Sequence, residues 1–189
     1  SDNFLNELAG SKLISASRNE FIFNSVISGS NPTFLKDHGV YGNIVLPGAA
    51  YIEIALTAGA EILKSENLKM TDLKFHKPMI LDIDESKNVQ SIFTKSDKYK
   101  YNFEIFSLSG NDILNWTLHS SGSVQIDKNV ENISEDFSEI KKQFIKEINT
   151  ETFYKQTNEI GIEYGHDFRG IKELYVNENH SLGLVKLNE

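Results

Sequence analysis

Residues 47–63 read PGAAYIEIALTAGAEIL, the most informative segment of the chain for its fold. Its polar side chains, Glu53, Thr57 and Glu61, recur every four residues. At 3.6 residues per turn, that spacing puts them in one narrow stripe of an α-helix that is apolar on its other sides. We therefore expect a core helix that is surrounded by the rest of the protein and ends near residues 64–67.

The residues before this helix carry one imidazole and two glycines. They read HGVYGNIVLP over residues 38–47, so that His38 opens a glycine-containing loop leading into Pro47. Proline is favoured at the first helical position, where no N–H is needed. Gly42 suits a backbone conformation that other residues resist. Because histidine can transfer protons near neutral pH, the sequence predicts a proton-transfer group at the start of a buried helix.

Runs with a period of two residues flank the helix and predict β-strands. The clearest run, 99–108, alternates apolar residues with Lys100, Asn102 and Glu104, and SGND at 109–112 predicts the turn that closes it. The other predicted strands cover residues 13–17, 20–26, 70–75, 89–95 and 114–125. One long helix with these strands favours the α+β class, with an antiparallel sheet wrapped around a central helix.

The composition becomes polar and charged between residues 127 and 150, which predicts a linker or an exposed segment. We divide the chain into a first domain at 1–126, a linker at 127–150 and the beginning of a second domain at 151–189. Within this last part we expect a helix at 152–159, a turn at 161–165, and strands at 168–175 and 181–187. Two strands and a short helix cannot bury a core alone, so this part is either incomplete or packs on the first domain.

Composition excludes several classes of function. Of the 189 residues, 39% are hydrophobic and 24% are charged, as in ordinary globular proteins. No apolar run reaches the roughly 20 residues of a membrane span and no signal peptide is recognisable, so we expect a cytoplasmic protein with no membrane partner. The lack of Cys excludes disulfides and thiolate sites, and the five His lack metal-site spacing. The net charge of −8 argues against a nucleic-acid partner.

The chain resembles the dehydratase domain of modular polyketide synthases, which has a double hot-dog fold. The family motif HxxxGxxxxP is present as His38, Gly42 and Pro47, directly before the long helix. The resemblance covers nearly the whole chain. It implies that the chain is the first half of a double hot dog, namely the N-terminal hot dog followed by the start of the C-terminal one.

Two further motifs support the resemblance. The family's GYxxGPxF is similar to GIEYGHDF at 161–168, which matches it at Gly161, Gly165 and Phe168, with Tyr164 or its neighbourhood taking the place of the motif's tyrosine; isoleucine stands at a usual aromatic position and His166 at the usual proline. The strand pattern W-x-x-H-x-x-G is similar to residues 116–122, in which we expect His119 to make a core or edge hydrogen bond.

The resemblance implies the removal of water from a 3-hydroxyacyl thioester, which an acyl carrier protein holds on phosphopantetheine, to give an enoyl thioester in polyketide biosynthesis. No other cofactor and no metal is needed. His38 is then the catalytic base, because an imidazole can take the proton next to the thioester. The Gly48 N–H, at the positive end of the helix, and the backbone of Val40 are candidates to stabilise the thioester oxygen. The implied substrate-binding residues also include Tyr164, Gly165 and Phe168.

The acid of the resembling family is an Asp in a DxxxQ or DxxxH helix of the second hot dog, and no carboxylate of these 189 residues matches it. The remainder of a longer chain supplies this Asp, or another polypeptide completes a split domain, or the chain is inactive alone. In single-hot-dog dehydratases of bacterial fatty acid synthesis, a Glu five residues after the Pro-Gly glycine is the acid across a dimer. Glu53 has that spacing, but its place in the polar stripe favours a structural role.

The expected partners are an acyl carrier protein, other synthase domains, and a second copy or a complementary second half. An alternative function is a non-catalytic hot-dog module that binds acyl-carrier partners or scaffolds a synthase. A weaker alternative is thioester hydrolysis on the same fold, which would release a free acid.

Overall fold

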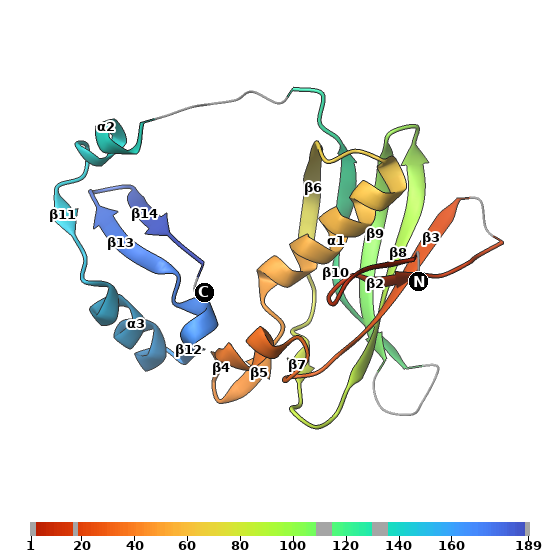
Figure 1. Cartoon of the computed structure of the whole chain (residues 1–189), viewed down its shortest axis with the longest axis horizontal. Helices are drawn as coiled ribbons and strands as arrows, with labels where there is room; N and C mark the ends of the chain where they lie inside the picture. The colour runs from red at the N-terminus through yellow and green to blue at the C-terminus, as the bar shows by residue number, and fades with distance from the viewer. Residues whose placement is uncertain (1–2, 17–18, 109–114, 130–135, 188–189) are drawn as a thin grey trace. The chain divides into compact units, whose positions relative to one another are not determined.

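The computed structural model describes residues 3–16, 19–108, 115–129 and 136–187, and it divides into two compact units (Figure 1). Unit 1 comprises Ser1–Leu35 and Ile44–Val130. Unit 2 comprises Lys36–Asn43 and Glu131–Glu189. The segment that carries His38 therefore belongs to the same unit as the C-terminal part of the chain, although it precedes the long helix in sequence.

Unit 1 contains a seven-stranded antiparallel sheet with the strand order β1-β2-β3-β8-β9-β10-β6 (Figure 1). Together with the helix on its face, this sheet confirms the predicted α+β class. The strands are β1 (Phe4–Asn6), β2 (Gly10–Lys12), β3 (Glu20–Ile27), β6 (Leu68–Phe75), β8 (Lys87–Asp97), β9 (Lys100–Leu108) and β10 (Trp116–Ile126). A short 3-10 helix, η1 (Thr33–Asp37), follows β3, and β5 (Asn43–Val45) pairs with β7 (Ile80–Leu81).

The strand predictions for this unit are confirmed, apart from one. The strand predicted at 13–17 is wrong, because residues 13–15 have no regular structure and the strand lies earlier, at β2. The position of β2 is set by its backbone pairing with β3. The weak alternation of apolar and polar residues at 13–17 did not indicate that pairing. The turn predicted at 109–112 lies outside the described residues.

The central helix, α1 (Gly48–Leu63), packs against β6, β9 and β10. Pro47 is its N-cap, with φ −65° and ψ 148°, so Gly48 is the first helical residue and the predicted start was one residue early. Lys64 ends the helix in a left-handed conformation, with φ 52°. The expectation of a helix surrounded on all sides is wrong, because Gly48, Ala49 and Glu53 are exposed while the opposite face is buried. One apolar face, lying on one sheet, accounts for the burial.

The polar stripe of α1 meets side chains from the first two strands. Glu53 Oε1 accepts hydrogen bonds from Asn6 Nδ2 at 3.1 Å and from Thr57 Oγ1 at 2.9 Å. Glu61 pairs with Lys64 at 2.7 Å and with Lys12 at 3.7 Å. The hydrogen bond from Lys64 is the main cause that lowers the pKa of Glu61. These contacts hold the polar side of the helix beside β1 and β2, in line with a structural role for Glu53.

The hydrophobic core of unit 1 is built from alternate residues of its strands. Phe93 on β8 is fully buried, with its ring centroid 5.8 Å from Phe23 and 5.9 Å from Phe103. On β9, Tyr101, Phe103 and Ile105 are buried, whereas Asn102 and Glu104 are exposed, as the period of two predicted. Burying a side chain such as phenylalanine contributes roughly 1.5–3 kcal/mol, so this face of the sheet supplies much of the stability of the unit.

His119 on β10 is buried, and both of its ring nitrogens make hydrogen bonds. Nδ1 lies 2.9 Å from the carbonyl oxygen of Lys77, and Nε2 lies 2.8 Å from Ser107 Oγ. Because a carbonyl can only accept, Nδ1 carries a proton in this contact, and the neutral ring then accepts at Nε2 from the Ser107 hydroxyl. Burial lowers the pKa of His119. The predicted core hydrogen bond of this strand histidine is confirmed.

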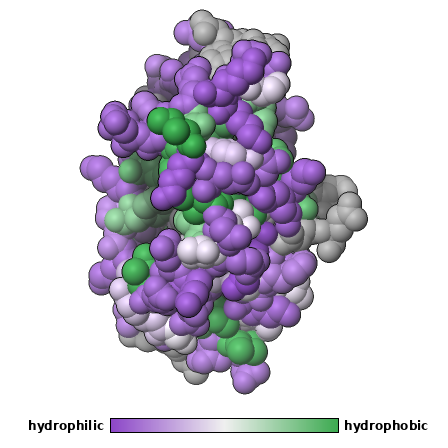
Figure 2. All heavy atoms as spheres, turned by 90° about the vertical axis from the view of Figure 1, so that its left-hand side faces the viewer, coloured by the Kyte–Doolittle hydropathy of each residue, from purple (hydrophilic) through white to green (hydrophobic). Residues whose placement is uncertain are grey.

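Unit 2 combines a short strand pair with a small three-stranded sheet. β4 (His38–Val40) pairs with β12 (Ile162–Tyr164), and the antiparallel sheet has the order β11-β13-β14. The remaining elements are α2 (Phe137–Lys141), β11 (Lys146–Glu147), α3 (Thr150–Glu159), η2 (His166–Phe168), β13 (Ile171–Val176) and β14 (Ser181–Val185). Figure 2 shows a face on which hydrophilic residues predominate and hydrophobic ones form small separate groups, which do not by themselves mark an interface.

The predictions for unit 2 are partly right. The helix expected at 152–159 is α3, and the last two predicted strands are β13 and β14 with shifted ends. The loop expected at His38 and the turn expected at 161–165 are wrong, because these segments pair with each other as β4 and β12. The range 127–150, predicted as a linker, carries α2 and β11. Over the described residues, no helix has the length and apolar character needed to span a bilayer.

Candidate active site

His38 lies on β4 directly opposite Tyr164 on β12. The next opposed pairs are Gly39 with Glu163 and Val40 with Ile162. Because successive side chains of a strand point to opposite faces, His38 and Tyr164 share one face of this pair, and Gly39 and Glu163 share the other. His38 is half-buried. The first family motif and the second therefore meet as two neighbouring strands.

Aromatic rings surround the imidazole of His38. Its centroid lies 5.1 Å from that of Phe168 and 5.8 Å from that of Tyr164. The rings of Tyr164 and Phe168 are nearly parallel, with an interplanar angle of 18° and a centroid distance of 6.2 Å. Tyr154 on α3 adds an edge-on contact to Tyr164 at 6.2 Å. The structure thus brings His38 of the first motif and Tyr164 and Phe168 of the second into one cluster.

Hydrogen bonds at one end of β4 tie it to the turn after β12. The Gly165 N–H donates to the carbonyl oxygen of Asp37 at 2.8 Å, and the Asp167 N–H donates to Asp37 Oδ2 at 2.9 Å. Gly165 is the N-cap of η2, and His166, at the family's proline position, is its first residue. With histidine in place of the family's proline, this segment forms a short 3-10 turn that ends at Phe168.

The other end of β4 is also held by hydrogen bonds. The Tyr41 N–H donates to the carbonyl oxygen of Gly161 at 2.7 Å, and the Gly42 N–H donates to Glu163 Oε1 at 3.2 Å. Tyr41 and Gly42 both have positive φ, 49° and 76°, the combination of a type I′ turn. The conformational role predicted for Gly42 is confirmed.

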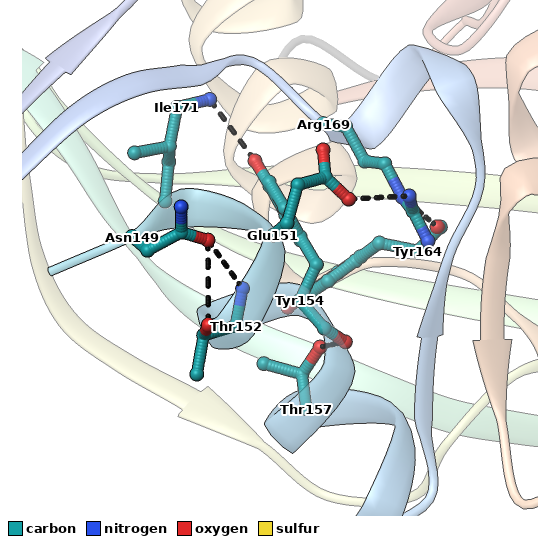
Figure 3. Close-up of polar contacts among 8 residues, drawn as sticks. All are labelled: Asn149, Glu151, Thr152, Tyr154, Thr157, Tyr164, Arg169 and Ile171. Carbon is teal, nitrogen blue, oxygen red and sulfur yellow. Dashed lines mark hydrogen bonds and ion pairs between the residues drawn. The ribbon is translucent and has the colours of Figure 1, made fainter.

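Next to Tyr164, the side chains of Tyr154 and Arg169 make further contacts (Figure 3). Tyr154, which is 4% exposed, accepts a hydrogen bond from the Ile171 N–H at 3.0 Å through its hydroxyl. Arg169 Nε donates to the carbonyl oxygen of Tyr164 at 2.9 Å, and its guanidinium lies 5.3 Å from the centroid of the Tyr154 ring. Glu151 lies 3.9 Å from Arg169 Nη1. These contacts support the strand that carries Tyr164.

Sequence reasoning missed Asp37, Tyr154 and Arg169. Asp37 could have been noticed as the neighbour of His38, but its partners lie about 130 residues away in the chain. Tyr154 and Arg169 belong to no motif that we recognised. Their contacts depend on how α3 and β12 are brought together, which leaves no local pattern.

Gly48 is exposed at the first position of α1. The N–H groups of the first helical turn have no partner within the helix and carry a partial positive charge, so the Gly48 N–H can bind an oxygen atom. Gly48 belongs to unit 1, whereas His38 and Val40 belong to unit 2. Their joint action on one thioester stays a prediction.

Comparison with known families finds two matches along this chain. A profile described as "Polyketide synthase dehydratase domain" matches residues 7–108, and one described as "Polyketide synthase dehydratase N-terminal domain" matches residues 134–189. Polyketide synthase PksM of Bacillus subtilis (strain 168) is 28% identical over 171 residues, covering 87% of this chain and 4% of the relative. Reducing polyketide synthase Preu2 of Preussia isomera is 27% identical over 191 residues, covering 94% and 8%. The chain spans less than a tenth of these relatives.

Solved structures give the same result for the fold. The dehydratase domain from the CurK module of curacin polyketide synthase has a TM-score of 0.91 and 28% identity, covering 98% of this chain and 66% of that one. Two further structures of CurK dehydratase are described as inactive mutants, one with histidine replaced by phenylalanine and one with aspartate replaced by asparagine. Their TM-scores are 0.88 and 0.90, at 28% and 29% identity, and they cover 97% and 98% of this chain and 64% and 66% of those chains.

Proposed function

The chain belongs to the dehydratase-domain family of polyketide synthases, and on that premise we propose that it removes water from a 3-hydroxyacyl thioester carried by an acyl carrier protein. The product is an enoyl thioester. The observation that carries the proposal is the half-buried imidazole of His38, packed against Tyr164 and Phe168. The imidazole and both rings come from the segments that carry the two family motifs.

In the proposed reaction, His38 acts as the base. One ring nitrogen takes the proton from the carbon next to the thioester carbonyl, and the electron pair of that C–H bond forms the new double bond. The C–O bond at the third carbon breaks, and the leaving hydroxyl departs as water after it receives a proton from an acid. Because the C–H electron pair becomes the double bond and the C–O electron pair leaves with the water oxygen, the reaction involves no net oxidation or reduction and requires no redox cofactor.

The surroundings of His38 suit this role. Aromatic contacts on the imidazole limit the orientations that the ring can adopt, and a fixed base gains much of its efficiency from correct placement. Tyr164, Gly165 and Phe168 then form part of the wall along which the acyl chain lies. The backbone of Val40, on the same strand as His38, and the Gly48 N–H are the proposed partners of the thioester oxygen.

We assign the acid to an Asp in the remainder of a longer chain or in a complementary polypeptide. The inactive CurK dehydratases support this division, since one lacks a histidine and the other an aspartate. Glu53 is a weaker candidate, because its carboxylate already accepts hydrogen bonds from Asn6 and Thr57.

The proposed partners follow from the same reaction. An acyl carrier protein presents the substrate on phosphopantetheine, and other synthase domains supply it and use the product. The great length of the relatives supports such an assembly. We also propose a second copy or a complementary half as a structural partner, and the cytoplasm as the location.

The experiment is mass spectrometry of a carrier-bound 3-hydroxyacyl substrate after incubation with this chain, with the polypeptide that completes the domain supplied. We expect loss of one water mass. His38→Ala should lower the rate roughly 10²–10⁴-fold, the usual contribution of a proton-transfer residue. His180→Ala is the matched control, because His180 lies in an exposed turn of the same unit.

Three results would contradict the proposal. Equal water loss with His38→Ala and the unchanged chain would remove His38 from the mechanism. Carrier binding without water loss, with the second half present, would indicate a non-catalytic module. Release of a free hydroxy acid would indicate thioester hydrolysis.

A further inference from the structure

We propose that Asp37 is a positioning residue that fixes the His38 imidazole by clamping the turn from Gly165 to Asp167. This inference rests on the proposed function, in which His38 is the base. Asp37 itself is not assigned any contact with the substrate. Its role is to hold both the strand that carries His38 and the turn that brings the aromatic rings to it.

The first line of support is that Asp37 holds the turn with two different groups. Its backbone carbonyl accepts from the Gly165 N–H at 2.8 Å, and its carboxylate accepts from the Asp167 N–H at 2.9 Å. A hydrogen bond to a charged group contributes more than a neutral one. Since the two bonds reach both ends of a three-residue turn, the turn cannot pivot on either one.

The second line of support is the close approach of Gly165 to the Asp37 side chain. A Cβ atom at position 165 would lie 2.4 Å from Asp37 Cγ and 2.6 Å from Oδ1. Real Cβ atoms essentially never approach other atoms so closely. Only glycine therefore allows the turn to rest on the Asp37 side chain, and any other residue would push the two apart.

The third line of support is the path from the clamp to the imidazole. The turn continues as η2, closed by the hydrogen bond from the Phe168 N–H to the Gly165 carbonyl oxygen at 3.1 Å. Phe168 at its end and Tyr164 just before it both contact the His38 ring. Because Asp37 directly precedes His38 in the chain, one residue contacts the turn with both its backbone carbonyl and its side chain, and that turn leads to a ring that contacts the imidazole.

The far end of β4 has its own attachments, from Tyr41 to Gly161 and from Gly42 to Glu163. Loss of the Asp37 carboxylate removes the hold on Asp167 and leaves the backbone bond to Gly165, so the Asp167 end of the turn and the Phe168 ring after it should shift relative to His38 while the far end of β4 stays in place. The expected effect is local displacement of the imidazole without unfolding of unit 2.

The test uses the 189-residue chain with labelled histidine, followed by NMR. His38 signals are assigned by their disappearance in His38→Ala. Neighbouring aromatic rings shift these signals, so Asp37→Ala should move them toward the values of a free histidine, and Gly165→Ala should do the same. Asp37→Asn keeps an acceptor oxygen for the Asp167 N–H and should keep the signals near their native positions.

Asp136→Ala is the matched control. Asp136 also accepts from a backbone N–H of unit 2, that of Ser138 at 2.8 Å, but it caps α2 and does not contact the His38 segment. We expect no movement of the His38 signals in this variant. In the completed, active domain, Asp37→Ala should lower kcat roughly 10- to 100-fold with KM little changed, because a misplaced base slows the chemical step and not binding.

Unmoved His38 signals in Asp37→Ala, or equal movement in Asp136→Ala, would overturn the clamp. If Asp37→Ala does not fold, Gly165→Ala and Asp37→Asn decide by the same signals, with displacement in the first and none in the second expected. The NMR result does not depend on catalysis. If the completed domain without substitutions fails to remove water but the His38 signals still move in Asp37→Ala, the proposed function is refuted and the positioning role of Asp37 stands.

Discussion

The interactions that stabilise unit 1 internally differ from those that stabilise unit 2. In unit 1, one hydrophobic cluster extends through the sheet and α1, and its buried members, from Leu8 to Val124, all belong to that unit. In the described part of unit 2, Tyr154 and Tyr175 are the buried hydrophobic residues. Unit 2 relies instead on ring contacts, helix caps and hydrogen bonds between its loops.

This difference matters because His38 belongs to unit 2. Apolar burial is non-directional and adds up over many side chains, so it determines the overall stability of unit 1. Hydrogen bonds depend strongly on direction, and each contributes only about 0.5–1.5 kcal/mol net. The candidate base is therefore placed by a few directional contacts, and single polar substitutions should affect its geometry more than the overall stability of the chain.

The largest expected effect lies in the core of unit 1. Phe93→Ala should lower the free energy of unfolding by about 3–5 kcal/mol, because it removes a fully buried ring and leaves a cavity between Phe23 and Phe103. Urea unfolding followed by the fluorescence of Trp116, which lies in unit 1, measures the change. Tyr99→Ala, at a residue that is 42% exposed, should cost less than about 1 kcal/mol. Equal losses in both variants would contradict a burial-dominated unit 1.

A smaller effect is expected from one hydroxyl of unit 2. Tyr154→Phe keeps the ring but leaves the Ile171 N–H without its acceptor, which should cost about 1–3 kcal/mol. Hydrogen exchange of the Ile171 amide should become faster, while amides of β9 in unit 1 stay protected. Tyr41→Phe is the control, since Tyr41 is 77% exposed. An unchanged exchange rate at Ile171 would show that this bond contributes nothing to unit 2.

The cap of α3 gives the next smaller effect. Asn149 accepts from the Thr152 N–H at 2.9 Å, so Asn149→Ala should cost about 1 kcal/mol and increase exchange in the first turn of the helix (Figure 3). Asn149→Asp keeps an acceptor and adds a favourable charge at the helix start, so it should retain the protection. Equal increases in hydrogen exchange of the first turn in both variants would show that the Asn149 cap does not stabilise this end of α3.

The smallest change under mild conditions should come from lowering the pH, and it should appear in unit 1. Burial lowers the pKa of His119 below the ordinary 6.5. The unfolded chain then binds a proton before the folded one does, so stability falls as the pH drops below about 6.5 and levels off below the folded pKa. Urea unfolding over this pH range measures the slope. His119→Asn should flatten it and His180→Asn should not, and an unchanged slope in His119→Asn would exclude His119 as its source.

Local periodicity predicted the elements that unit 1 needs. The four-residue spacing from Glu53 to Glu61 identified α1, and the alternation along β9 identified the buried face of the sheet, because both patterns repeat within one element. The exposure of Gly48 and Ala49 was not predicted, since small residues can lie in either environment. What covers a small residue depends on the neighbouring elements.

The short strands of unit 2 were harder to predict from the sequence than the long elements of unit 1. β12 has three residues between two glycines and was predicted as a turn, and β4 was predicted as a loop. Neither is long enough to show a period of two. Each is a strand only because the other lies beside it, at a separation of more than 100 residues in the chain.

The amino-acid sequence alone determined the α+β class, the central helix and the motifs of the dehydratase family, because each is encoded in residues that are close together in the chain. Two features depend on long-range contacts: the His38 segment belongs with the C-terminal unit, and Asp37 accepts hydrogen bonds from Gly165 and Asp167. Hydrogen bonds between distant segments form when the chain folds, and they leave no periodic trace in either segment.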